Sequence, residues 1–360
     1  MTSSKRRRRG IALLAGVVTA ALALSGCAGG SSSTSSTSGA SVSEAAQASS
    51  APASAAAFPV TIDTAYGPIT VAKKPERIVA LTGRHVELLD LLGETPVAFT
   101  DYGATNDELI EAYPWMAGML TGEADPALFT ADYLPSAEAV AAVKPDLILT
   151  SIWQTDEPLY AQLSQIAPTF VGTQTDSNTT WQDDLTALAK LTGHDASIVE
   201  QTQAEVDAKL AAAAEQLPGL KGKTFYVAAL GEAGAGDELS LYNAAAPELI
   251  AMGLTPGAGQ PVDGSENTGA KSFSQENVDQ LNADVLLVAT EHRDPDGAIK
   301  AKLQADPRVA ELPATKNGTL IYLNTPQWNA VNGGSAASTI WWVDQVVPTL
   351  AASALNQSGQ

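Results

Sequence analysis

The fold is decided by a stretch that occurs twice, as SAEAVAAVKPDLIL at residues 136–149 and as SQENVDQLNADVLL at residues 274–287. Both copies begin Ser-x-Glu-x-Val, continue for a helical turn or two, and reach an Asp that opens an apolar, strand-like run. One copy alone is weak evidence, because Ser-x-Glu suits the start of any helix. Two copies at corresponding places predict two related lobes with a cleft between them.

Short apolar runs alternate with helical stretches around both copies. Strands are predicted at 77–81, 96–100, 147–150, 169–172, 224–230, 285–288 and 319–323. Helices are predicted at 86–93, 137–143, 244–252, 277–281 and 336–350. Strands separated by helices favour parallel sheets, so the predicted fold class is α/β, with two Rossmann-like lobes of mostly parallel sheet.

The middle of the chain has a helical pattern without a strand. Residues 180–191 and 195–217 predict two helices, and the second would span roughly 34 Å. That length suits one rigid helix that joins two lobes. The predicted organisation is an N-terminal lobe, a helical segment with the bridging helix, a C-terminal lobe and a tail, over 58–178, 179–218, 219–350 and 351–360.

The first residues have the pattern of an export signal. Five basic residues at 5–9 precede an apolar run at 11–24, and the string LSGC ends at Cys27, the only cysteine. We interpret 1–26 as a lipoprotein signal peptide and Cys27 as the lipidated residue, which places the protein on the outer face of the cytoplasmic membrane. An ordinary signal peptide with an incidental cysteine is the alternative. The Ser, Ala and Gly of 27–57 predict a flexible tether.

Composition excludes several classes of function. Without 1–26 the chain carries 15 Lys+Arg against 40 Asp+Glu, which argues against binding to nucleic acid or to anionic lipid. Three histidines without a His-rich loop argue against a zinc or manganese carrier. No G-x-S-x-G motif is present, so we expect no enzyme and no cofactor, with an exported α/β hydrolase as a distant alternative.

Further motifs occur in a characteristic order. They are KPERIVAL at 74–81, LAKLTG at 188–193, DPR and LPA within 306–314, and a Trp-rich end over 328–342. With the two Ser-x-Glu units, they make residues 75–350 resemble the substrate-binding proteins of iron–siderophore and vitamin B12 ABC importers. The resemblance implies a periplasmic binding protein of the helical-backbone type, with ligand between the lobes and little hinge closure. It also implies a monomer that delivers its ligand to an ABC permease dimer with its ATPase.

The resemblance also assigns a role to one glutamate in each lobe. In the family such residues dock onto arginines of the permease, and the matching positions here are Glu138 and Glu276. The alternative is that both carboxylates only stabilise the start of a helix.

Ligands of open α/β sheets bind beyond the carboxyl ends of the strands. We expect Arg84 and Arg293 to bind siderophore oxygens, and Tyr102, Trp153 and Trp328 to pack against the ligand. The glycine-rich turn 231–236 lies at the same predicted edge. No direct metal ligand is expected, because a siderophore saturates its iron, although His85 and His292 are candidates.

The ligand itself stays open. Two arginines supply little positive charge, so a ferric hydroxamate is favoured over the more anionic catecholates. Cobalamin or haem is the alternative within the same family. Haem would need an axial ligand such as Tyr102 or His292.

Overall fold

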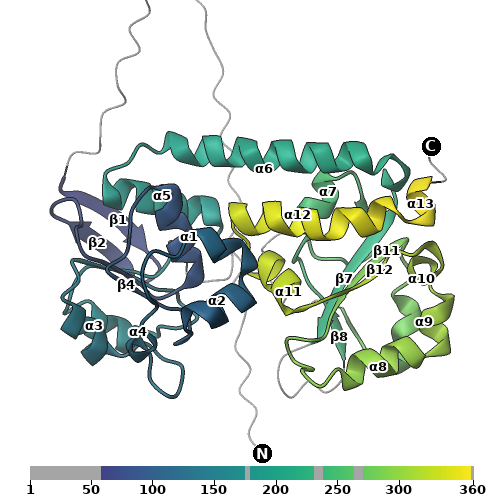
Figure 1. Ribbon diagram of the computed structural model, residues 1–360, viewed down its shortest axis with the longest axis horizontal. Helices are drawn as coiled ribbons and strands as arrows, with labels where there is room; N and C mark the ends of the chain where they lie inside the picture. The colour runs from purple at the N-terminus through teal and green to yellow at the C-terminus, as the bar shows by residue number, and fades with distance from the viewer. Residues whose placement is uncertain (1–57, 175–178, 231–237, 263–270, 358–360) are drawn as a thin grey trace, which may run out of the picture. The chain divides into compact units, whose positions relative to one another are not determined.

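The computed structural model contains two sheet-bearing lobes (Figure 1). It describes residues 58–174, 179–230, 238–262 and 271–357. A four-stranded sheet lies in the N-terminal lobe and a six-stranded sheet in the C-terminal lobe, which confirms the predicted pair of α/β lobes. No helix in these ranges is long and apolar enough to cross a membrane. Cys27, the tether and the turn 231–236 lie outside the described residues.

The N-terminal sheet is parallel throughout, in the order β4-β3-β5-β6. All its strand residues are apolar or threonine and are buried, as expected for a parallel sheet covered on both faces. Its strands fall within the predicted runs: β3 (Ile78–Ala80), β4 (Ala98–Phe99), β5 (Leu147–Leu149) and β6 (Thr169–Phe170). An antiparallel hairpin that we did not predict precedes them: β1 (Val60–Thr64) and β2 (Gly67–Val71).

Polar caps set where the N-terminal helices begin. Thr82 Oγ1 accepts a hydrogen bond from the His85 backbone N–H at 3.1 Å, so α1 begins at Gly83. The prediction that this helix begins at residue 86 was therefore wrong, because Gly83, Arg84 and His85 make its first turn. The elements are α1 (Gly83–Leu91), α2 (Asn106–Ala112), η1 (Pro114–Gly118), η2 (Pro126–Leu128), α3 (Ala137–Val143) and α4 (Glu157–Leu163).

The C-terminal sheet mixes directions. Its parallel strands are β7 (Thr224–Leu230), β9 (Thr255–Pro256), β11 (Val285–Ala289) and β12 (Leu320–Leu323). Two short antiparallel strands extend one edge, β8 (Leu239–Leu241) and β10 (Ser272–Phe273). The prediction had no strand at either place, because runs of two or three residues are too short to show an alternating pattern.

The helices of the C-terminal lobe include one that the sequence pattern did not predict, over residues 325–332. Asn324 and Gln327 form a capping box that starts α11, so Trp328 lies in a helix. The elements are α7 (Ala246–Ala251), η4 (Gln275–Gln280), α8 (Ala298–Ala305), α9 (Pro307–Glu311), α10 (Pro313–Asn317), α11 (Thr325–Asn332), α12 (Ala336–Ala351) and α13 (Ala354–Gln357).

A long helix joins the lobes. After α5 (Trp181–Thr192), α6 (Ser197–Gln216) runs about 30 Å before η3 (Pro218–Leu220), which confirms the predicted bridging helix. It does not bridge alone, because α12 packs along it (Figure 1). Lys209 of α6 pairs with Asp344 of α12 at 2.5 Å.

One hydrophobic cluster is shared by both lobes. In β3, Ile78 and Ala80 join this cluster, whereas Val79 faces a separate cluster with α3 and α4. In β7, Phe225 faces the shared cluster and Tyr226 faces a third one with α8 and α9. The strand period of two thus sends alternate side chains to the common core and to each lobe's own core.

The two copies of the repeated sequence place an aspartate in the same role. Asp146 accepts hydrogen bonds from the Glu76 and Arg77 backbone N–H groups at 2.9 and 2.8 Å, which ties the start of β5 to that of β3. Asp284 accepts from the Thr224 backbone N–H and hydroxyl, both at 2.9 Å, and so ties β11 to β7. The copies differ in the element before the strand, an α-helix in the first and a 3-10 helix in the second.

Candidate ligand-binding site

The carboxyl ends of β3, β4 and β5 meet at one edge of the parallel N-terminal sheet. A buried polar network lies just beyond them. Asp101 accepts hydrogen bonds from the Tyr113 hydroxyl at 2.9 Å and from Gln154 Nε2 at 2.8 Å. Burial raises the pKa of Asp101, and these bonds partly offset the rise. The network therefore holds the loop after β4 against the loop after β5.

Each of these loops presents an exposed aromatic side chain next to the network. Tyr102 follows Asp101, is 46 % exposed and has a φ of 48°, in the left-handed region. Trp153 precedes Gln154 and is 71 % exposed. Both were predicted as ligand walls, and the structure places both at the strand-end edge with accessible rings.

The corresponding edge of the C-terminal lobe is built from stacked rings. His292 follows β11, and its ring stacks on that of Trp328 with a centroid distance of 5.0 Å. Tyr242 meets the Trp328 ring edge-on, with a centroid distance of 5.4 Å. Trp328 is only 4 % exposed, so it lies behind His292 rather than open to a ligand. Burial, together with the neighbouring Arg293, lowers the pKa of His292 to about 4, which keeps the imidazole neutral at pH 7. Arg293 itself is exposed.

Arg84 lies in a different setting from Arg293. Its guanidinium donates to the carbonyl oxygens of Gly333, Gly334 and Thr179 and to the carboxylate of Asp184. These are five hydrogen bonds for a group with five N–H donors. A ligand bond to Arg84 would require one of them to open, and its role in binding stays a prediction.

Two buried ionisable residues lie on α1 in this region, and one of them, Glu87, was missed from the sequence. Glu87 is buried, and burial raises its pKa to about 7. His85 is buried too, and burial lowers its pKa to about 3. A signal for Glu87 was present, because it stands in the apolar run Val86–Leu89 of an otherwise amphipathic helix.

The two predicted docking residues lie on the surface. Glu138 is in the first turn of α3, and Glu276 is in η4, and both are exposed. Arg308 donates to the backbone carbonyl of Glu276 and so holds this turn in place. Their contact with a permease stays a prediction.

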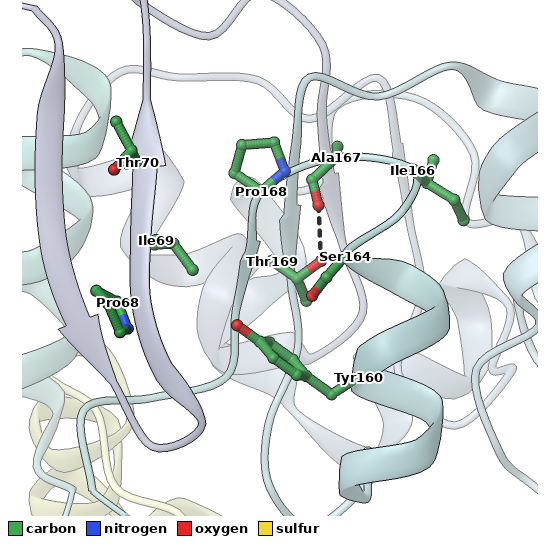
Figure 2. Close-up of a pocket in the computed structure, with 9 residues that line it drawn as sticks. All are labelled: Pro68, Ile69, Thr70, Tyr160, Ser164, Ile166, Ala167, Pro168 and Thr169. Carbon is green, nitrogen blue, oxygen red and sulfur yellow. Dashed lines mark hydrogen bonds between the residues drawn. The ribbon is translucent and has the colours of Figure 1, made fainter.

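Two surface hollows lie away from the strand-end edges. The first, of about 400 Å³, lies between β2 and the segment from α4 to the start of β6 (Figure 2). Tyr160 and Ile69 face each other across it. The second lies between α10 and the end of α12. Within the described residues, no three His, Cys, Asp or Glu side chains gather as a metal site.

Comparison with known proteins decides the family. Residues 78–326, more than two thirds of the chain, match the family described as periplasmic binding protein. The chain belongs to this family. The matched range runs from β3 into α11 and ends two residues before Trp328. It contains the N-terminal strand-end edge, His292 and Arg293 of the C-terminal edge, the bridging helix α6, and both Glu138 and Glu276.

Relatives of known name cover parts of the chain. The ferric enterobactin-binding periplasmic protein FepB of Escherichia coli O6:H1 is 35 % identical over 171 residues, which are 45 % of this chain and 51 % of that protein. The match thus spans about half of the curated relative's length.

Solved structures cover more of the chain. A periplasmic solute binding protein from Mycobacterium smegmatis is 27 % identical with a TM-score of 0.64, over 81 % of this chain and 97 % of its own. PiaA of Streptococcus pneumoniae, solved in complex with ferrichrome, is 25 % identical with a TM-score of 0.61 over the same shares.

Proposed function

We propose that the protein is the extracytoplasmic binding component of an ABC importer and captures a ferric siderophore between its lobes. The observation that carries this proposal is that the two strand-end edges present complementary kinds of side chain. The N-terminal edge presents the accessible rings of Tyr102 and Trp153, and the C-terminal edge presents the accessible cation of Arg293. Rings pack against an apolar ligand shell and a guanidinium bonds anionic oxygens, which are the two parts of a ferric siderophore. The named ligands of FepB and PiaA, ferric enterobactin and ferrichrome, support the same class.

Within this class, the charge of the site favours a hydroxamate over a catecholate. Of the two predicted arginines, Arg84 is already paired with Asp184. Arg293 is therefore the main accessible cation among the predicted contacts, which suits a ligand of low negative charge.

A titration of tryptophan fluorescence tests the proposal. Trp153 lies at the site, so ferrichrome should quench its emission with a micromolar or tighter Kd. Trp153→Phe should weaken the quenching, and Tyr133→Phe, which alters another exposed ring, should not. Absence of binding for ferrichrome and for ferric enterobactin would refute the siderophore proposal.

The same titration separates the alternative ligands. Haem would show a shifted Soret band that Tyr102→Phe or His292→Gln abolishes, because those are the candidate axial residues. Cobalamin would bind without dependence on either residue. Binding of haem or cobalamin alone would replace the siderophore proposal within the same family.

Delivery to the permease is proposed to use Glu138 and Glu276, with Cys27 and the tether 27–57 keeping a monomer beside the permease dimer and its ATPase. The carboxylates are exposed on both lobes, as docking to arginines requires.

The double variant Glu138→Arg, Glu276→Arg tests this docking role, and it should keep ligand affinity and lose uptake in cells. The matched control is Glu157→Arg, Glu311→Arg, which reverses one exposed helix charge in each lobe and should leave uptake normal. Normal uptake by the first pair would exclude the docking role.

A further inference from the structure

A buried carboxylate connects the two lobes beside the strand-end edges. Glu87 of α1 accepts a hydrogen bond from Trp115 Nε1 of η1 at 2.8 Å through Oε1. Its other oxygen, Oε2, accepts from the hydroxyl of Ser335. Ser335 is the N-cap of α12 and accepts from the Ser338 backbone N–H at 3.0 Å. One carboxylate of the N-terminal lobe thus holds the first residue of the helix that packs along α6.

Arg84 reinforces the same contact from one turn earlier on α1. Its guanidinium bonds the carbonyl oxygens of Gly333 and Gly334, immediately before Ser335. Trp115 also packs on Trp341 of α12, with ring centroids 5.3 Å apart. The turn 333–335 is therefore held by two side chains of opposite charge from a single helix face.

We propose that Glu87 is a positioning residue that sets the orientation of the two lobes, and with it the separation of Tyr102 and Trp153 from Arg293. Its effect on ligand affinity rests on the proposed function. Its effect on lobe geometry does not.

The buried carboxylate of Glu87 is better suited to fix the orientation of the lobes than to stabilise the fold. An apolar side chain would fill the space without the cost of burying a carboxylate. A carboxylate between two donors instead accepts only one arrangement of Trp115 and Ser335, because hydrogen bonds are directional. Exchange of the acid for an apolar residue should therefore loosen the lobe orientation even where the fold survives.

The contact should respond to pH. The charged or titratable groups that face Glu87 are Arg84 on its own helix, Asp101 after β4 and Tyr113 before η1. From α12 it receives only the Ser335 hydroxyl. Burial raises the pKa of Glu87 to about 7, and the bonds from Ser335 and Trp115 oppose the rise. Protonation removes the negative charge that faces Arg84 and reverses the Ser335 bond, in which the acid O–H then donates to Oγ. The contact loses its charge-assisted hydrogen bonds and should therefore weaken as the pH falls.

The test measures the distance between the lobes directly. Spin labels on cysteines, introduced by Gln162→Cys on α4 and Gln304→Cys on α8 in a full-length Cys27→Ser chain in detergent, report that distance by pulsed electron resonance. Both positions are exposed. We expect one narrow distribution of the distance between the labels at pH 8.5, and a broader or shifted one at pH 5.5. The two pH values lie on either side of the pKa of Glu87. Glu87→Gln should give the same distribution at both pH values, and Glu87→Ala and Ser335→Ala should broaden it without adding to each other.

Glu248 supplies the matched control. It also has a partly buried carboxylate whose pKa burial raises, and its Oε1 accepts from Thr339 of α12 at 3.3 Å. It lies, however, on α7 of the same lobe as α12. Glu248→Ala should lower the melting temperature and leave the distance distribution unchanged. An unchanged distribution in Glu87→Ala, with a melting temperature lowered as in Glu248→Ala, would overturn the positioning role.

Ferrichrome titration of the same variants completes the test. Glu87→Ala should weaken binding about tenfold, whereas Glu248→Ala should not. If wild-type protein binds neither ferrichrome nor ferric enterobactin, the proposed function fails, while the distance measurement still decides the role of Glu87.

Discussion

The strand-end edges of the two lobes are built by different physical means. In the N-terminal lobe a buried carboxylate, Asp101, gathers Tyr113 and Gln154, and the accessible rings stand next to that network. In the C-terminal lobe the support is aromatic, with Trp328 between His292 and Tyr242. Directional hydrogen bonds hold the loops that carry the N-terminal rings, while the C-terminal edge is stabilised mainly by the burial of stacked rings. One lobe should therefore be sensitive to changes of charge and the other to changes of volume.

Loss of volume at the C-terminal edge should have the largest effect. Trp328→Ala removes a buried ring from the cluster shared by both lobes and should cost about 3–5 kcal/mol of unfolding free energy. Trp153→Ala, at the N-terminal edge, removes an exposed ring and should change that free energy by less than about 0.5 kcal/mol. Urea denaturation measures both, and similar values would contradict the comparison.

Loss of the carboxylate at the N-terminal edge should come next. Asp101→Ala leaves the Tyr113 hydroxyl and the Gln154 amide without their partner, at a cost of about 1–3 kcal/mol. Asp101→Asn keeps the size and one acceptor oxygen, so it should recover part of that loss. If Asn is as destabilising as Ala in denaturant titrations, the network does not act through its acceptor oxygens.

The two histidines at these edges should respond unequally to acid. The buried His85 has a pKa of about 3, and the half-buried His292 one of about 4, both below the ordinary 6.5. Since the unfolded chain binds a proton first, each contributes stability above about pH 6.5 that is lost as the pH falls towards its folded pKa. His85→Gln should therefore flatten the stability profile between pH 6.5 and 3 more than His292→Gln. The measurement is urea denaturation at several pH values, and equal slopes would contradict the difference in burial.

The smallest change in stability should come from Arg293, and its comparison with Arg84 separates structure from binding. Arg293→Ala removes an exposed side chain, so it should leave the melting temperature unchanged and weaken ferrichrome binding about tenfold. Arg84→Ala removes five hydrogen bonds and should lower the melting temperature. Calorimetry and fluorescence titration distinguish them. A stable Arg84→Ala protein that fails to bind would restore Arg84 as a direct ligand contact.

Much of the fold could be predicted from local pattern. The apolar runs placed β7 at its observed bounds, the repeated unit placed α3 at its observed bounds, and the long polar–apolar stretch indicated α6. The short strands β8 and β10 were missed, because they gain their partners from the sheet and carry too few residues for a period of their own. For the site, the chain order of the strand ends indicated where Tyr102, Trp153 and Arg293 would lie.

What the sequence by itself determined is the order of elements, the duplication of the lobes and the family, because these depend on patterns within about 15 residues and on motif order. Only the tertiary structure decided which of the predicted site residues face outward. Arg84 meets Gly333 across 249 positions of the chain, and Trp328 is covered by His292 from another strand end. The local pattern of apolar residues does not indicate such a distant partner, because the accessibility of a side chain depends on what the rest of the chain packs against it.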